Sequence, residues 1–92
     1  MSFRQPVANV FTSDPDHAIV VGTVTQGEIS TGQLVAVPIQ GSEVRVQVLG
    51  LQRFGAIIEQ ATVGQEIGMQ LKGIAPTLIA VGSVVKGPLL AE

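Results

Sequence analysis

Hydrophobic and polar residues alternate along much of this chain with a period of two, the pattern of β-strands that bury one face. The clearest case is Glu43–Val48. We predict a half-buried antiparallel strand here. Its buried face would carry Val44, Val46 and Val48, and its exposed face Glu43, Arg45 and Gln47.

The segment Gln65–Lys72 has the same design. Gly68 lies inside it, where a glycine often marks a bulge or the close approach of another backbone. The predicted inward residues are Ile67, Met69 and Leu71, and the outward ones are Glu66, Gln70 and Lys72.

Four further strands are predicted from apolar runs bounded by turn residues. They are Val7–Thr12, His17–Gln26, Leu34–Val37 and Ser83–Lys86. His17–Gln26 is apolar on both faces over Ile19–Val21, so we expect a central strand, covered on both sides and the most buried of all. Pro38 ends the Leu34 strand, and Ile74–Val81, which contains Pro76, is expected to hold one helical turn. Residues 87–92 are expected to be a tail.

Three of these strands follow a glycine, namely Gly32, Gly64 and Gly82. Each is expected to supply a turn with positive φ. Their unequal spacing argues against a solenoid or propeller. About six strands in a chain of 92 residues predict one all-β domain, residues 1–92, and we favour a small closed antiparallel β-barrel because closure removes exposed strand edges.

Composition adds a surface argument. Hydrophobic residues make up 46% of the chain, but charged residues only 13%, against about 25% in ordinary soluble domains. So little charge favours a surface partly covered by another chain, and self-association is the simplest way to cover it. A densely apolar barrel with a Gln, Thr and Ser exterior is the alternative.

The compartment is inferred from signals that the sequence lacks. The apolar runs are too short for a membrane span, and no apolar signal-peptide region follows Met1. The chain contains no cysteine, so it has neither disulfides nor thiolate metal ligands. We therefore expect a cytoplasmic protein.

The apolar and glycine positions also match one family in order and spacing. The matched residues are Phe3-x-x-Pro6-Val7-x-x-Val10-Phe11, Val21-Gly22-Thr23-Val24-x-x-Gly27-x-Ile29-x-x-Gly32, Leu51-x-x-Phe54, Ala61-x-x-Gly64-x-x-Ile67-Gly68-x-x-Leu71-x-Gly73-Ile74 and Ile79-x-x-Gly82-x-Val84. Over residues 3–86 the chain resembles the second, β-barrel domain of the translational GTPases, most closely that of elongation factor Tu. The resemblance implies the barrel fold and a translation elongation context.

In that family the barrel follows a GTPase domain and, in elongation factor Tu, helps to hold the aminoacyl end of tRNA. This chain has no Gly-x-x-x-x-Gly-Lys-Ser/Thr loop, so it is expected to bind no nucleotide and to hydrolyse no GTP alone.

The family's tRNA-facing residues are largely replaced here. Ala8-Asn9 stands where the family has an acidic pair, and Pro15-Asp16-His17 where it has Gly-Arg-Gly. Gly55-Ala56 replaces basic residues after the matched Phe54, and Glu66 replaces an asparagine. The barrel residues thus persist where the aminoacyl-tRNA residues do not.

Catalytic, metal and cofactor sites find little support. His17 lies beside Asp14 and Asp16, which could hold a metal, but Asp14-Pro15-Asp16 is also an ordinary turn, the interpretation that we favour. We expect the other acids, Glu28, Glu43, Glu59 and Glu66, to be solvated and therefore without a perturbed catalytic pKa. No catalytic residue, cofactor or metal is predicted, and the chain is expected not to be an enzyme.

Nucleic-acid binding is the second hypothesis. The net charge is −2 and the cations appear scattered along the sequence at Arg4, Arg45, Arg53, Lys72 and Lys86. Without clustered cations and stacking aromatics, binding to tRNA or other RNA would be weak and salt-sensitive.

Arg53–Ile58 is the candidate interface. Its apolar residues are consecutive rather than alternating, so some must lie outside the core, and an arginine beside a phenylalanine is typical of an interface anchor. The candidate residues are Arg53, Phe54, Ile57 and Ile58. In the alternative, Phe54 and Ile58 cap one barrel mouth.

The first hypothesis is therefore a non-catalytic barrel that self-associates or docks onto a protein. Leu78, Ile79 and Leu89-Leu90 could extend the interface.

Overall fold

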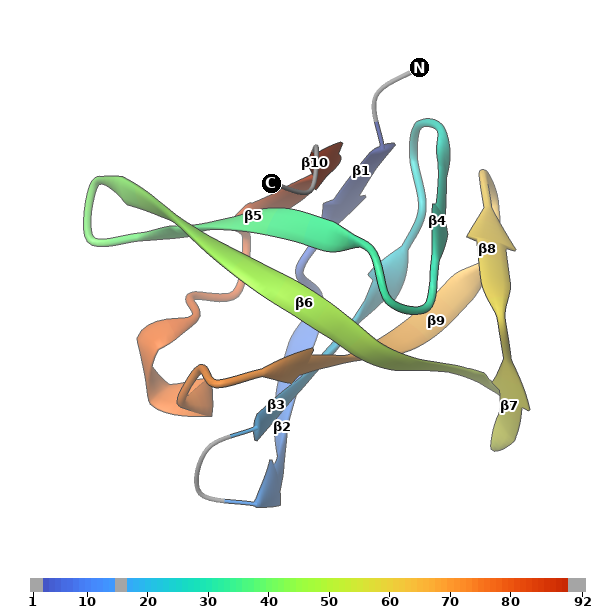
Figure 1. Ribbon diagram of the computed structural model, residues 1–92, viewed down its shortest axis with the longest axis horizontal. Helices are drawn as coiled ribbons and strands as arrows, with labels where there is room; N and C mark the ends of the chain where they lie inside the picture. The colour runs from blue at the N-terminus through green and yellow to red at the C-terminus, as the bar shows by residue number, and fades with distance from the viewer. Residues whose placement is uncertain (1–2, 15–16, 90–92) are drawn as a thin grey trace.

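The computed structural model describes residues 3–14 and 17–89. These residues form ten β-strands and one turn of 3₁₀ helix (Figure 1). The elements are β1 (Phe3–Pro6), β2 (Asn9–Asp14), β3 (His17–Thr23), β4 (Glu28–Ser30), β5 (Leu34–Ile39), β6 (Ser42–Arg53), β7 (Ala56–Ile58), β8 (Gln60–Thr62), β9 (Glu66–Lys72), η1 (Pro76–Leu78) and β10 (Val84–Leu89).

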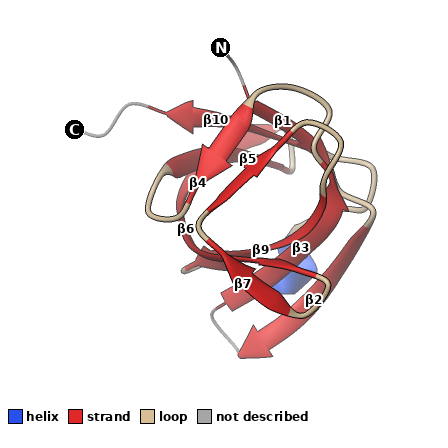
Figure 2. Ribbon diagram, turned by 90° about the vertical axis from the view of Figure 1, so that its right-hand side faces the viewer, coloured by secondary structure: helices blue, strands red, loops and turns tan. Residues whose placement is uncertain are grey.

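Seven antiparallel strands follow one curved path, β1-β10-β5-β6-β9-β3-β2 (Figure 2). Strand β7 pairs with β6, and β4 and β8 form a separate two-stranded ribbon. The long strand β6 belongs to both halves, since its first part pairs with β5 and its last part with β9. The path begins at β1 and ends at β2, consecutive strands separated only by Val7 and Ala8. The sheet therefore curls back on itself, and the predicted all-β antiparallel architecture, which is compatible with a barrel, is confirmed.

The core consists of the inward positions of this sheet. Ile67, Met69 and Leu71 are buried as predicted, and so are Val46 and Val48. The prediction for Val44 was wrong, because this side chain is 38% exposed. Val44 lies near the end of the β5–β6 hairpin, which projects beyond the barrel (Figure 1).

Two predicted turn features are confirmed. Gly32, Gly64 and Gly82 have φ values of 93°, 89° and 96°. The helical turn η1 lies inside Ile74–Val81. A different glycine, Gly22, allows β3 to cross β1, since a Cβ there would collide with the Pro6 carbonyl oxygen.

The strand count differs from the prediction because β1, β4, β7 and β8 are too short to show alternation in the sequence. The predicted tail also begins too early. After an irregularity beyond Lys86 the chain pairs again, with Leu89 opposite Leu34, so residues 87–89 belong to β10. Residues 90–92 lie outside the described residues.

The coverage expected for β3 was wrong on one face. Ala18 and Val20 are buried, but Ile19 and Val21 on the opposite face are only half-buried. This outer face of β3 leads to the candidate site.

Candidate binding groove

The β6–β7 hairpin carries the predicted interface residues. Arg53 pairs with Ala56 across a two-residue turn made by Phe54 and Gly55, whose φ values are 53° and 79°. Positive φ at both central positions is the pattern of a type I′ turn, whose twist matches that of the flanking strands. The turn directs the Phe54 side chain away from the barrel.

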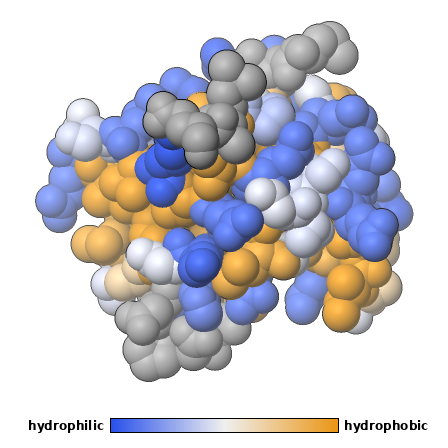
Figure 3. All heavy atoms as spheres, in the orientation of Figure 1, coloured by the Kyte–Doolittle hydropathy of each residue, from blue (hydrophilic) through white to orange (hydrophobic). Residues whose placement is uncertain are grey.

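The four candidate residues divide into two groups. Phe54 is 82% exposed and Ile57 is 83% exposed. Ile58 is half-buried and packs against the core. An exposed fraction of 82% does not fit the alternative in which Phe54 caps a barrel mouth. Figure 3 shows hydrophobic side chains at the lower right, where Figure 1 draws β7.

Arg53 lies against Phe54 and is half-buried. Its guanidinium carbon is 4.9 Å from the centroid of the Phe54 ring, a cation–π distance. Its Nε is buried and has no hydrogen-bond partner among the described residues. An unsatisfied buried donor is unfavourable, so this hairpin end is not optimised for the isolated chain.

A groove runs beside the hairpin over the outer faces of β3, β9 and the end of β6. Three hollows share lining residues and so form one continuous groove. The first, of about 300 Å³, is lined by Phe11, Ile19, Val21, Gln52, Phe54, Gly55, Glu66, Ile67 and Gly68. The second, of about 200 Å³, is lined by Ile19, Leu49, Gly50, Leu51, Gln52, Ile57, Gly68 and Gln70. The third, of about 540 Å³, is lined by Ser30, Thr31, Leu49, Gly50, Ile57, Ile58, Glu59 and Gln60.

Two strand-interior glycines make the floor of this groove. A Cβ at Gly68 would lie 3.4 Å from Cγ2 of Ile19, and a Cβ at Gly50 would lie 3.8 Å from Oε1 of Gln70. Both are ordinary van der Waals distances, so the fold has room for a Cβ at each position. A glycine inside a strand weakens it and often marks a site where another molecule approaches closely.

Neither alternative predicted for Gly68 is found at this glycine. The atoms nearest to a Cβ there belong to the Ile19 and Val21 side chains and not to another backbone. The bulge occurs on the neighbouring strand β6, where the register shifts between Val48 and Gly50.

The ionisable groups that line the groove are acidic. Glu66 lies in the first hollow and Glu59 in the third, and both are exposed. No lysine or arginine lines any of the three hollows among the described residues. The groove thus offers apolar surface and negative charge, which is unfavourable for phosphate groups.

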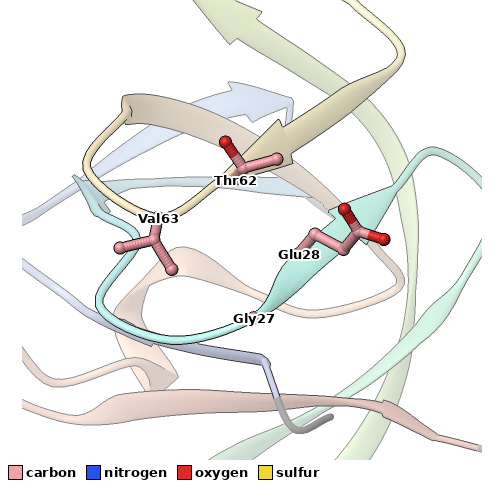
Figure 4. Close-up of a pocket in the computed structure, with 4 residues that line it drawn as sticks. All are labelled: Gly27, Glu28, Thr62 and Val63. Carbon is pink, nitrogen blue, oxygen red and sulfur yellow. The ribbon is translucent and has the colours of Figure 1, made fainter.

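A further hollow lies at the β4–β8 ribbon. It has a volume of about 410 Å³ and is lined by Gly27, Glu28, Thr62 and Val63 (Figure 4). Glu28 and Thr62 lie opposite each other in the ribbon. Both side chains are exposed to solvent, so neither has the desolvated environment in which a carboxylate activates a hydroxyl nucleophile.

The acidic candidates lie on the surface, and no metal site is found among the described residues. Glu28, Glu43, Glu59 and Glu66 are all exposed, as predicted. His17 is half-buried and pairs with Lys72 across β3 and β9. Pro15 and Asp16 lie outside the described residues. Among residues 3–14 and 17–89, no group of three or more potential ligands is placed to hold a metal.

Three cations that are far apart in sequence are close in the sheet, so the description of the cations as scattered was wrong. Lys86 pairs with Arg4 on one side and with Ala36 on the other, and Ala36 pairs with Arg45. Arg4, Lys86 and Arg45 thus form a row across β1, β10, β5 and β6, which we call the basic row. Lys86 Nζ also lies 3.8 Å from a Glu43 carboxylate oxygen.

Of the residues expected to extend the interface, Leu78 is 46% exposed, but Ile79 is buried in the core and cannot contribute. Leu89 is half-buried, and Leu90 lies outside the described residues.

The groove itself, including Phe11, Leu49 and Gly50, was not predicted from the sequence. The signals were Gly68 inside a strand and Leu49 directly after Val48, which breaks the alternation. Their meaning depends on the β6–β9 register, which only the structure provides.

Comparisons with known proteins show one group of relatives. No protein-family model matches it. It is 34% identical over 86 residues to elongation factor Tu 2 of Streptomyces avermitilis, covering 94% of this chain and 22% of that protein.

Solved structures of translation elongation factors contain the same fold. The translation elongation factor SelB of Methanococcus maripaludis, in its apo form, matches with a TM-score of 0.85 and 21% identity, over 95% of this chain and 19% of that one. Its complex with the GTP analogue GppNHp gives the same values. The chain thus spans about one fifth of the length of these relatives.

Within the described residues, no helix is long and apolar enough to cross a membrane. The resemblance found in the sequence is confirmed, and the chain is related to the second, β-barrel domain of the translational GTPases, with elongation factor Tu among its relatives.

Proposed function

We propose that this chain is a non-catalytic binding module that docks onto a protein through the groove beside the β6–β7 hairpin. The carrying observation is the groove floor, where Gly50 and Gly68 carry no side chain although a Cβ would fit at either position without a clash. Strand-interior glycines weaken a sheet and often mark a site where another molecule approaches closely, so two of them under an apolar groove favour a partner that binds there.

The surroundings of the groove support this proposal. Phe11, Leu49, Phe54 and Ile57 are large exposed hydrophobic residues that line it. Aromatic residues beside an arginine are typical anchors of protein interfaces. Because its named relatives are elongation factors, we expect the chain to act in the cytoplasm alongside translation and without a GTPase activity of its own.

Photo-crosslinking in the native cells tests the proposal. A benzoylphenylalanine at Ile57, which is 83% exposed, should give a protein adduct. Gly68→Val should abolish that adduct, because the valine side chain fills the groove floor while the fold has room for its Cβ. A label at Val44, on the other hairpin, is the matched control and should give no Gly68-dependent adduct.

Absence of any protein adduct at Ile57, or an adduct that ribonuclease removes, would overturn the proposal. An adduct that persists in Gly68→Val would show that the groove is not the docking site.

The basic row favours a second candidate, binding of RNA. Arg4 and Lys86 lie directly opposite each other, and their two positive charges outnumber the one carboxylate, that of Glu43, which lies beside Lys86. Arg4→Glu should then abolish electrophoretic retardation of a tRNA at low salt, while Lys72→Glu, with the same change in charge, should not. No retardation by the unaltered chain at low salt would remove this candidate.

A further inference from the structure

The geometry of the hairpin and groove points to a second copy of this chain as the occupant. In the arrangement that we infer, two copies meet about a two-fold axis, each Phe54 enters the first hollow of the other copy, and each Arg53 faces the other copy's Glu66. This inference rests on the proposed function and names its partner.

The projecting part of the interface is the turn of the β6–β7 hairpin. Phe54 has a φ of 53°, and a bulky residue in this left-handed region is an outlier that costs stability. It also leaves an aromatic ring 82% exposed. Both penalties are removed or offset if the ring is buried against another molecule, since burying an aromatic side chain removes about 150–250 Å² from water.

The receiving part is the first hollow, with its volume of about 300 Å³. Its floor is Gly68, and its apolar walls are Phe11, Ile19 and Val21. Phe54 itself lies on the rim of the same hollow. A projection and a hollow that share one surface patch are what a two-fold interface requires, because the same patch then serves both copies.

The charges on this patch are also self-complementary. Glu66 lines the first hollow, and Arg53 is the cation directly before Phe54. Stacking on Phe54 keeps the Arg53 guanidinium at the hairpin end. When the Phe54 ring enters the hollow of the other copy, the guanidinium therefore lies next to that hollow. Across a two-fold axis, Arg53 of each copy would meet Glu66 of the other, giving two opposite-charge contacts.

Charge exchange between two variants tests this arrangement. Arg53→Glu alone places like charges at both contacts of a homodimer, and so does Glu66→Arg alone. Each should weaken self-association at least tenfold in sedimentation equilibrium. A mixture of the two variants restores opposite charges at both contacts, so we expect a heterodimer of the two chains with an affinity close to that of the unaltered protein.

The mixture separates association from folding, because a charge contact within one chain cannot be repaired by adding a second chain. Lys72→Glu and Glu28→Arg are matched controls at exposed residues that do not line the groove, and they should leave association unchanged. Circular dichroism checks that every variant keeps its strands.

Two results would overturn the inference. One is an unaltered chain that stays monomeric up to high micromolar concentration, and the other is a mixture that associates no better than its components. Either result, together with a Gly68-dependent adduct to a different protein at Ile57, would support the docking function and would show only that the partner is not a second copy of this chain. No Gly68-dependent adduct would remove both.

Discussion

The barrel has two hairpins with the same turn and different surfaces. The β5–β6 hairpin turns through Gln40 and Gly41, with φ values of 49° and 83°, and the β6–β7 hairpin turns through Phe54 and Gly55, with 53° and 79°. Both are two-residue turns between paired strand residues. Both turns therefore require a positive φ at their first central residue. This residue is polar in the β5–β6 hairpin, where it is Gln40, and aromatic in the β6–β7 hairpin, where it is Phe54.

The difference separates what folding needs from what binding needs. Asn, Asp and Gly are favoured at the first central position of such turns, because they tolerate positive φ. Glutamine is a modest departure from this preference, whereas phenylalanine is a larger one that also exposes an apolar ring. Neither the barrel core nor the turn geometry calls for Phe54, and the interface proposed above would account for it.

The largest expected effect is on association. Phe54→Asn should weaken self-association by about thirtyfold or more, since an aromatic anchor at an interface centre contributes at least about 2 kcal/mol. Gln40→Asn, which places the same residue at the equivalent position of the other turn, should leave self-association unchanged. Sedimentation equilibrium of both variants measures the contrast, and equal losses in the two would remove the distinction between the hairpins.

Glycine substitutions should affect both hairpins alike. Gly41→Ala and Gly55→Ala each place a Cβ in the left-handed region, which costs roughly 1–2 kcal/mol of unfolding free energy. Urea denaturation at a concentration where the chain is monomeric measures this loss. A much smaller loss at Gly55 than at Gly41 would contradict the shared turn geometry.

The sequence predicted these hairpins unevenly, for physical reasons. Alternation identified the buried faces of β6 and β9, because burial on one face of a strand is a local property. It also indicated exposed residues in Arg53–Ile58, where alternation fails. The groove and the basic row were not predictable, because each joins residues such as Gly50 and Gly68, or Arg4 and Arg45, through the pairing of distant strands.

A smaller effect is expected on monomer stability. Gln40→Asn should raise the free energy of unfolding by about 0.5–1 kcal/mol, because asparagine tolerates the turn conformation better. Phe54→Asn gains the same relief but loses the contact with Arg53, which at an exposed site contributes about 0.5–1 kcal/mol. Its net gain should therefore be close to zero. A gain at Phe54 equal to that at Gln40 would mean that the Arg53–Phe54 contact contributes nothing.

The smallest effect is that of salt on the proposed dimer. Exposed ion pairs contribute about 0.2–1 kcal/mol each and are screened at high ionic strength, whereas the burial of Phe54 and Ile57 is not weakened by sodium chloride. A tenfold rise in salt should therefore raise the dissociation constant of the dimer by less than about tenfold. RNA bound at the three cations of the basic row would respond very differently, because the release of about three counterions predicts a loss of about 500-fold over the same range. Light scattering of the chain alone measures the salt dependence of the dimer, and tRNA binding measured in parallel gives that of the basic row. The two measurements would thus distinguish an apolar contact at the groove from a phosphate contact at the basic row, because only the phosphate contact depends strongly on salt.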